Sequence, residues 1–145
     1  MKRIALAIIA LAGFSSSYIA FPTSAHANVC RWQVDGKWTA YQRRDGNTVR
    51  IGMDLKQSRD NFRGSAFTNS LGWGSVDGNM NDKDFIGVIV WSDGRRGSYR
   101  AHVDTQWNGN QQSFVLVGTS FGVEAPHVLY QWWNSRPMYY RCFPN

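Results

Sequence analysis

Apolar and polar residues alternate through most of the chain with a period of two. In residues 49–55, Val, Ile, Met and Leu occupy every second position, and Arg, Gly and Asp lie between them. This pattern is typical of a β-strand that buries one face. After the first 27 residues, no window of ten positions shows the apolar spacing of a helix. The pattern therefore predicts an all-β chain.

Short runs of Gly, Asn, Asp and Ser separate the alternating segments and predict hairpin turns, because these residues tolerate positive φ or cap their own backbone. The turns are expected at residues 45–47, 58–61, 81–84, 93–94 and 108–110. Between them we expect eight strands, near residues 37–43, 48–57, 62–67, 75–80, 85–92, 98–105, 111–118 and 127–133. A short lead-in from Cys30 to Val34 could extend the first strand.

The connections between these strands are short, which favours a meander in which each strand pairs with the next. Eight meandering strands lose their exposed edges when they close into an antiparallel up-and-down barrel. The interior of such a barrel holds side chains or one small ligand. We therefore expect an eight-stranded meander barrel, with a two-sheet β-sandwich as the alternative.

The amino terminus has the features of a secretory signal peptide. Lys2 and Arg3 precede an apolar run from Ile4 to Phe14, and Ala25-His26-Ala27 forms an A-x-A cleavage site. The apolar run is shorter than the roughly 20 residues of a spanning helix. The residues before Cys30 lack the Leu of a lipoprotein cleavage site. We expect residues 1–27 to be removed and residues 28–145 to form one secreted or periplasmic domain.

The two cysteines, Cys30 and Cys142, lie at the two ends of the mature chain. In an oxidising compartment this placement predicts one disulfide that ties the ends together. The net charge of +6 falls to about +4 when Lys2 and Arg3 are removed, so the mature domain is moderately basic. Its seven tryptophans either fill the barrel or line a ligand site.

In a meander, every odd-numbered connection opens at the same end of the barrel. We call this end the barrel mouth, and it collects basic and aromatic residues: Arg43, Arg44, Trp73, Arg95, Arg96, Glu124 and His127. We expect the mouth to bind an anionic or sugar-like ligand. The alternative interpretation is that these arginines are solvated side chains on turns.

Several short runs in the second half of the chain resemble the barrel of avidin and streptavidin. They are FIGVIVW (85–91), GSY (97–99), DTQW (104–107) and the late Trp132. The resemblance implies an eight-stranded barrel with Trp91, Trp107 and Trp132 around a ligand, and it places Tyr99 where a tryptophan is usual. Gly64-Ser65-Ala66 stands where that family has Gly-Thr-Tyr, so the biotin ligands are not retained.

A non-enzymatic binding protein is the favoured function. An exported proteinaceous inhibitor or host-interaction protein is the alternative, and a secreted basic nuclease is the second alternative. A nuclease would need His102 and His127 to meet in one cleft, and the spacing of neither histidine selects this arrangement. Two mature histidines, with both cysteines in a disulfide, do not make a metal-ligand set. We expect no metal and no cofactor.

Two predicted strands are apolar on both faces. If Phe85, Ile89 and Trp91 fill the barrel, then Ile86, Val88 and Val90 face outward, and residues 114–117 present the same problem. Exposed apolar strands are usually covered, so we expect self-association through the outer faces of residues 85–91 and 114–117. The alternative cover is the chain's own tail, residues 135–144.

Overall fold

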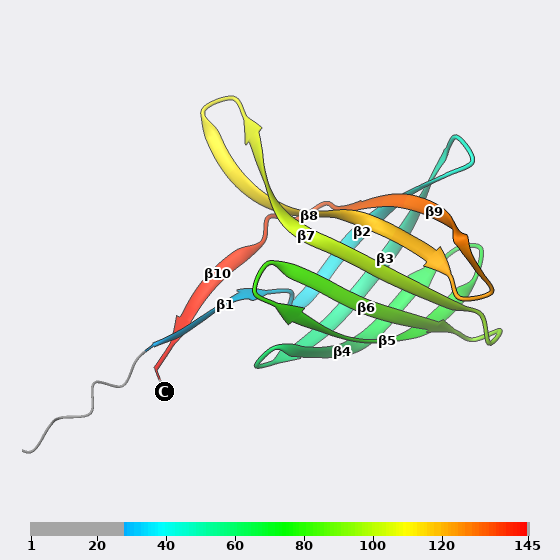
Figure 1. Cartoon of the computed structure of the whole chain (residues 1–145), viewed down its shortest axis with the longest axis horizontal. Helices are drawn as coiled ribbons and strands as arrows, with labels where there is room; N and C mark the ends of the chain where they lie inside the picture. The colour runs from blue at the N-terminus through cyan, green and yellow to red at the C-terminus, as the bar shows by residue number, and fades with distance from the viewer. Residues whose placement is uncertain (1–27, 145) are drawn as a thin grey trace, which may run out of the picture.

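The computed structural model describes residues 28–144, and in this range it is entirely β-structure and turns (Figure 1). Eight strands form a closed barrel in the order of the sequence, β2-β3-β4-β5-β6-β7-β8-β9, and all neighbours are antiparallel. The strands are β2 (Gly36–Arg44), β3 (Asn47–Ser58), β4 (Asn61–Thr68), β5 (Gly72–Asn81), β6 (Asp84–Trp91), β7 (Arg96–Asn108), β8 (Gln111–Gly122) and β9 (Ala125–Asn134). The predicted meander barrel is confirmed, and the sandwich alternative is wrong.

The five predicted hairpin turns lie where the sequence places them, and each contains a residue in the left-handed backbone conformation. The connections β4–β5 and β8–β9 were expected to be longer and are also short turns. Asp45 and Gly46 have positive φ in the β2–β3 turn, and Gly94 and Gly109 do so in two later turns. Such conformations suit Gly and Asp. The turns bring β2–β3, β4–β5, β6–β7 and β8–β9 to one end, which is the barrel mouth (Figure 1).

Large rings fill the middle of the barrel, so it is not an open tube. Phe62 and Phe85 stack with ring centroids 4.6 Å apart, and Trp132, which is fully buried, packs edge-on against Phe85 and Tyr99. Two glycines allow close packing inside the barrel. A Cβ at Gly78 would overlap the Phe62 ring, and a Cβ at Gly118 would overlap the carbonyl oxygen of Arg100 on the neighbouring strand. The core therefore leaves space for a ligand only near the ends.

The lead-in and the tail form a separate two-stranded sheet. β1 (Val29–Gln33) pairs with β10 (Tyr139–Phe143), with Cys30 directly opposite Cys142, and the two cysteines are bonded. The predicted disulfide is confirmed, and it indicates a non-reducing environment. The suggestion that Cys30 to Val34 extends the first barrel strand is wrong, because β1 ends at Gln33 and the chain turns before β2, which begins at Gly36 with φ 96°.

The tail does not cover the outer face of β6. Residues 139–143 pair with β1, and the preceding Met138 donates its backbone N–H to the carbonyl oxygen of Phe114. Trp32 packs between the rings of Phe114 and Tyr140 and closes the end of the barrel opposite the mouth. Ile86 and Val90 stay 41% and 39% exposed. The intramolecular alternative for covering this face is therefore wrong.

The predicted signal peptide, residues 1–27, lies outside the described residues. Within residues 28–144, no helix qualifies as a membrane span.

Candidate ligand site at the barrel mouth

The barrel mouth contains a cavity of about 190 Å³. Five barrel strands and three turns contribute its wall, so it is a product of barrel closure rather than of one segment. Its lining residues are Gln42, Arg44, Leu71, Trp91, Arg95, Arg96, Gly97, Tyr99, Ser120, Phe121, Gly122, Glu124, Ala125, Val128 and Tyr130. Pockets for drug-sized ligands measure roughly 300–1,000 Å³. This cavity therefore suits a smaller ligand, such as one sugar ring or a small anion.

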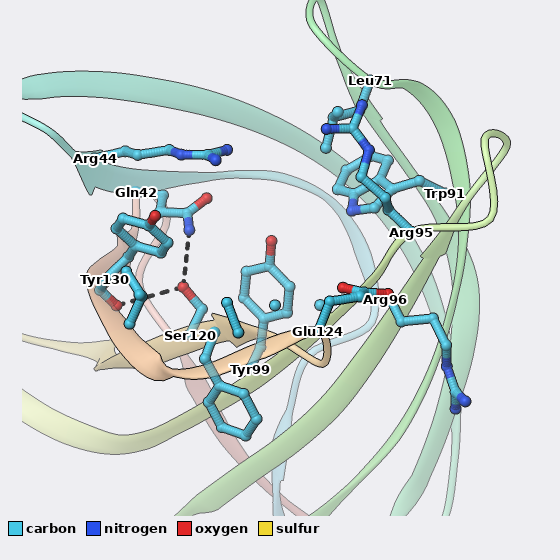
Figure 2. Close-up of a pocket in the computed structure, with 15 residues that line it drawn as sticks. Gln42, Arg44, Leu71, Trp91, Arg95, Arg96, Tyr99, Ser120, Glu124 and Tyr130 are labelled. Carbon is cyan, nitrogen blue, oxygen red and sulfur yellow. Dashed lines mark hydrogen bonds between the residues drawn. The ribbon is translucent and has the colours of Figure 1, made fainter.

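Tyr99 is a buried aromatic side chain in the wall of this cavity. It is only 4% exposed, its ring packs edge-on against Trp132, and its hydroxyl group points into the cavity (Figure 2). Among residues 28–144, none forms a hydrogen bond with this hydroxyl group. Burial raises the pKa of Tyr99, and the positive charge of Arg44 opposes the rise. The group is therefore a neutral phenol at physiological pH, able both to donate and to accept a hydrogen bond.

A short hydrogen-bond chain orients Gln42 beside Tyr99. The Ser120 hydroxyl donates to the carbonyl oxygen of Tyr130 at 3.4 Å and accepts from Gln42 Nε2 at 3.0 Å (Figure 2). Because the hydroxyl has one hydrogen to donate, the amide nitrogen of Gln42 must face Ser120. The amide oxygen of Gln42 is then turned toward the Tyr99 side of the cavity. The wall thus offers a fixed acceptor next to a phenol.

The arginines at the mouth are partly neutralised by nearby carboxylates. Arg95 holds Asp93 through its Nε at 2.6 Å and its terminal nitrogen at 2.5 Å, which lowers the pKa of Asp93. Arg44 Nε lies 4.0 Å from Asp45, and its guanidinium lies 5.2 Å from the centre of the Tyr130 ring. Glu124 places a further carboxylate in the cavity wall itself. The mouth is therefore less basic than its arginines alone suggest.

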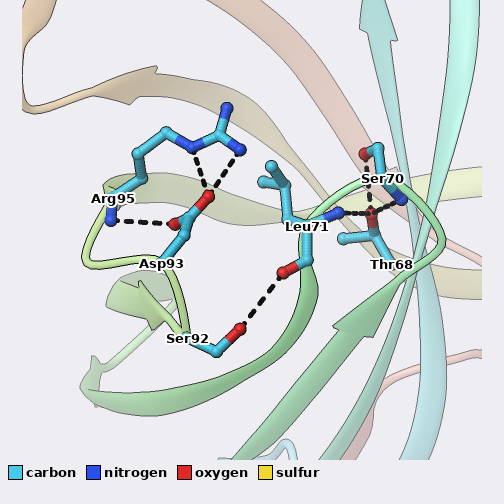
Figure 3. Close-up of polar contacts among 6 residues, drawn as sticks. All are labelled: Thr68, Ser70, Leu71, Ser92, Asp93 and Arg95. Carbon is cyan, nitrogen blue, oxygen red and sulfur yellow. Dashed lines mark hydrogen bonds and ion pairs between the residues drawn. The ribbon is translucent and has the colours of Figure 1, made fainter.

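The rim is held by contacts between two turns (Figure 3). Ser92, in the β6–β7 turn, donates its backbone N–H to the Trp73 carbonyl oxygen at 2.8 Å and its hydroxyl to the Leu71 carbonyl oxygen at 3.4 Å. The buried Thr68 hydroxyl accepts the N–H of Ser70 at 3.0 Å within the β4–β5 turn. These bonds hold Leu71 on one side of the cavity, and Trp91 is held there by its backbone N–H, which donates to the carbonyl oxygen of Arg95 at 2.9 Å.

Five of the sequence-predicted site residues line this cavity: Arg44, Trp91, Arg95, Arg96 and Tyr99. The Arg96 side chain points away from the cavity centre (Figure 2). The other five lie elsewhere. Arg43 and His127 are exposed and do not line the cavity.

The three remaining tryptophans each miss the cavity for a different reason. Trp73 lies on the outer face of β5 and is 63% exposed. Trp107 is 66% exposed near the β7–β8 turn, which belongs to the opposite end of the barrel. Trp132 is fully buried below Tyr99, and its indole N–H donates to the carbonyl oxygen of Thr119 at 3.1 Å, so it supports the floor without lining the cavity.

Sequence reasoning missed several polar wall residues, mainly Gln42, Ser120 and Tyr130. The signal for Gln42 was present, because Trp38 and Ala40 are buried and a period of two continues their inward face to Gln42 and Arg44. The same rule turns Arg43 outward.

Comparison of the chain with models of known protein families, with characterised proteins and with solved structures finds no match. The closed eight-stranded antiparallel barrel is compatible with a calycin-like fold. The function must therefore be argued from the site.

Proposed function

We propose that this protein is a non-enzymatic binding protein that holds a small anionic or sugar-like ligand in its barrel mouth. The observation that carries the proposal is Tyr99, whose ring is buried while its hydroxyl group faces the open cavity and bonds to no other described residue. A hydroxyl group held in this way can both donate a hydrogen bond to a ligand and accept one from it. The Gln42 amide oxygen would bind a second polar group of the same ligand.

Trp91 and Leu71 give the cavity an apolar side opposite these polar groups. A sugar ring has both polar edges and an apolar face, and a small anion would be drawn by Arg44 and Arg95. The avidin-type resemblance supports a ligand inside the barrel, but the biotin ligands of that family are missing here, so biotin is not the proposed ligand. The disulfide supports function in a secreted or periplasmic location.

A nuclease is not proposed. His102 pairs with Asp84 beside the β5–β6 turn, whereas His127 lies at the start of β9 beside the mouth, and neither lines the mouth cavity.

The test is a thermal-shift and calorimetric screen of the mature protein against monosaccharides, uronic acids, phosphate, sulfate and small carboxylates. We expect at least one class to bind. Tyr99→Phe removes one hydroxyl group and should lower the affinity for a neutral ligand by about 3- to 10-fold. It should lower the affinity for an anion by about 10-fold or more, because hydrogen bonds to charged groups are stronger. Tyr139→Phe, at the opposite end, is the matched control. The proposal fails if no compound binds, or if Tyr99→Phe binds as tightly as the wild type.

A further inference from the structure

A row of residues on the outer face of the barrel presents two exposed rings. Thr39, Gly52, Phe67 and Trp73 lie opposite one another on β2, β3, β4 and β5. Trp73 is 63% exposed and Phe67 is 38% exposed, and their ring centroids are 5.1 Å apart. Exposed apolar groups that are bordered by polar residues often mark a binding groove.

Gly52 makes a hollow in this row that packing does not require. A Cβ at Gly52 would meet only the Phe67 carbonyl oxygen, at 3.9 Å, which is an ordinary contact, and Gly52 does not have positive φ. By contrast, a Cβ at Gly64 or Gly118 would overlap the backbone of the neighbouring strand. A glycine inside a strand weakens it and often marks a place where a ligand approaches closely. The barrel would accept a side chain at Gly52, so the hollow requires another explanation.

The hollow belongs to a groove of about 400 Å³, which we call the outer groove. It is lined by Lys37, Trp38, Thr39, Gly52, Met53, Asp54, Ser65, Phe67 and Trp73, none of which lines the mouth cavity. Lys37 Nζ lies 3.8 Å from Asp54 Oδ2, so the two charges in the groove cancel. Thr39 and Ser65 add hydroxyl groups. The outer groove therefore combines an aromatic surface with hydrogen-bonding groups and has no net charge.

We propose that the outer groove is a second binding site, which takes an uncharged sugar residue of a glycan. The apolar face of the sugar ring stacks on Trp73, and its hydroxyl groups bond to Lys37, Asp54 and the neighbouring hydroxyls. The balanced charge selects a neutral ligand over an anion, since an anion would gain from Lys37 only what it loses to Asp54. The Gly52 hollow gives the sugar room beside Phe67.

The test is native gel electrophoresis of the mature protein in gels that contain a soluble β-glucan, an α-mannan or glycol chitin. Two variants address the groove: Gly52→Val fills the hollow, and Trp73→Ala removes the stacking surface. Two controls match these variants: Thr48→Val introduces the same valine elsewhere on the outward face of β3, and Trp107→Ala removes an exposed tryptophan at the opposite end. We expect retardation by at least one polysaccharide, an affinity loss of at least tenfold in both groove variants, and changes below twofold in both controls.

Each other outcome overturns the proposal. It fails if no polysaccharide retards the protein, or if Gly52→Val and Trp73→Ala bind like their controls. It also fails if sedimentation without glycan shows a dimer that Gly52→Val dissociates, because a second copy would then cover the groove. Circular dichroism and thermal unfolding check that the variants fold. Tyr99→Phe should bind the polysaccharide as the wild type does, so failure at the mouth and failure at the outer groove are distinguishable.

Discussion

Tyr99 combines a buried ring with a hydroxyl group that no other described residue binds. The ring packs edge-on against Trp132, and the hydroxyl group faces the mouth cavity. Water that enters the cavity can bond to this hydroxyl group, so a ligand that displaces the water loses affinity unless it offers a hydrogen bond of its own. The hydroxyl group therefore favours a ligand with a polar group at this point.

We predict that Tyr99 makes the folded protein sensitive to alkaline pH. Burial raises the pKa of Tyr99 in the folded state above the value of about 10 expected in the unfolded chain. Above that pH the unfolded chain releases the proton and the folded protein retains it, so stability is lost as pH rises. Tyr99→Phe lacks this contribution. In thermal unfolding between pH 8 and 11.5, the melting temperature of Tyr99→Phe should fall less steeply than that of the wild type, while Tyr139→Phe should follow the wild type.

Two glycines of the barrel should respond to alanine in opposite ways. Gly118→Ala places a Cβ against the Arg100 carbonyl oxygen and Ala101, and should lower the free energy of unfolding by about 1–3 kcal/mol or more. Gly52→Ala meets no such obstacle and should be neutral or stabilising by up to about 1 kcal/mol. Urea unfolding of both variants measures the difference. Equal losses of unfolding free energy in the two variants would contradict the distinction between Gly118, which close packing requires, and Gly52, which it does not.

Period-two alternation correctly assigns most side chains to the inside or the outside of the barrel. Counting the connections of the meander gives only the end of the barrel at which a residue lies. Phe85, Ile89 and Trp91 are buried and Ile86 and Val90 are exposed, as the pattern predicts. The count places Trp73 at the mouth end of the barrel. Because Val76 is buried and side chains alternate along β5, the Trp73 side chain points outward. The position of Trp132 below the cavity depends on how far the stacked rings fill the barrel, and the sequence contains no direct measure of that depth.

At the level of elements, the β7–β8 hairpin extends beyond the barrel (Figure 1). β6 pairs with β7 only as far as His102, and β9 pairs with β8 only from Val117, while β7 and β8 continue to pair with each other up to Asn108 and Gln111. Residues 105–112 therefore form a two-stranded ribbon with no neighbouring strand. An isolated ribbon is marginally stable in water.

We predict that this ribbon opens far more readily than the barrel. Amide hydrogen exchange at neutral pH should be fast in residues 105–112 and slow in residues 97–102 of the same strand, β7, because only the latter are covered on both sides. Exchange monitored by mass spectrometry or NMR gives the comparison. Equal protection in both segments would mean that another molecule or copy covers the ribbon.

The free ribbon also explains where the sequence misplaced strand ends. The sixth strand was expected at 98–105 and runs from Arg96 to Asn108, because a ribbon without a buried face has no apolar alternation to mark it. The turn residues were more informative, since the left-handed backbone at positions such as Asp45 and Gly109 imposes a specific residue choice. β1 and β10 were not separable from the barrel by pattern, because their pairing depends on two segments 112 residues apart.

At the level of the whole molecule, we predict that the disulfide stabilises the fold without defining it. The bond joins residues 112 positions apart, and both lie outside the barrel strands β2–β9. In the chain-entropy model its loss costs about 4–5 kcal/mol. The double variant Cys30→Ser, Cys142→Ser should unfold at lower urea but retain the far-UV spectrum of the wild type. A variant that is unfolded in buffer would show that the β1–β10 pair is needed for barrel closure.

We further predict self-association through the outer faces of β6 and β8. Ile86, Val90 and Val117 are 41%, 39% and 37% exposed in the single chain, and a second copy would bury them. Light scattering at micromolar concentration should report a mass above that of one chain, and Val90→Asp with Val117→Asp should restore one chain. Thr48→Asp, on the outward face of β3, is the control, because β3 is not part of the β6–β8 surface. A single-chain mass for the wild type would contradict the prediction.

The meeting of β1 and β10 has a practical consequence for handling the protein. Val29 and Phe143 lie opposite each other, and β1 leads into the end of β2 farthest from the mouth. Attachment to a sensor chip or a carrier domain next to Val29 or Phe143 would leave the mouth facing the bulk solution. The domain is thus suited to oriented immobilisation, with its anchoring point and its opening at opposite poles.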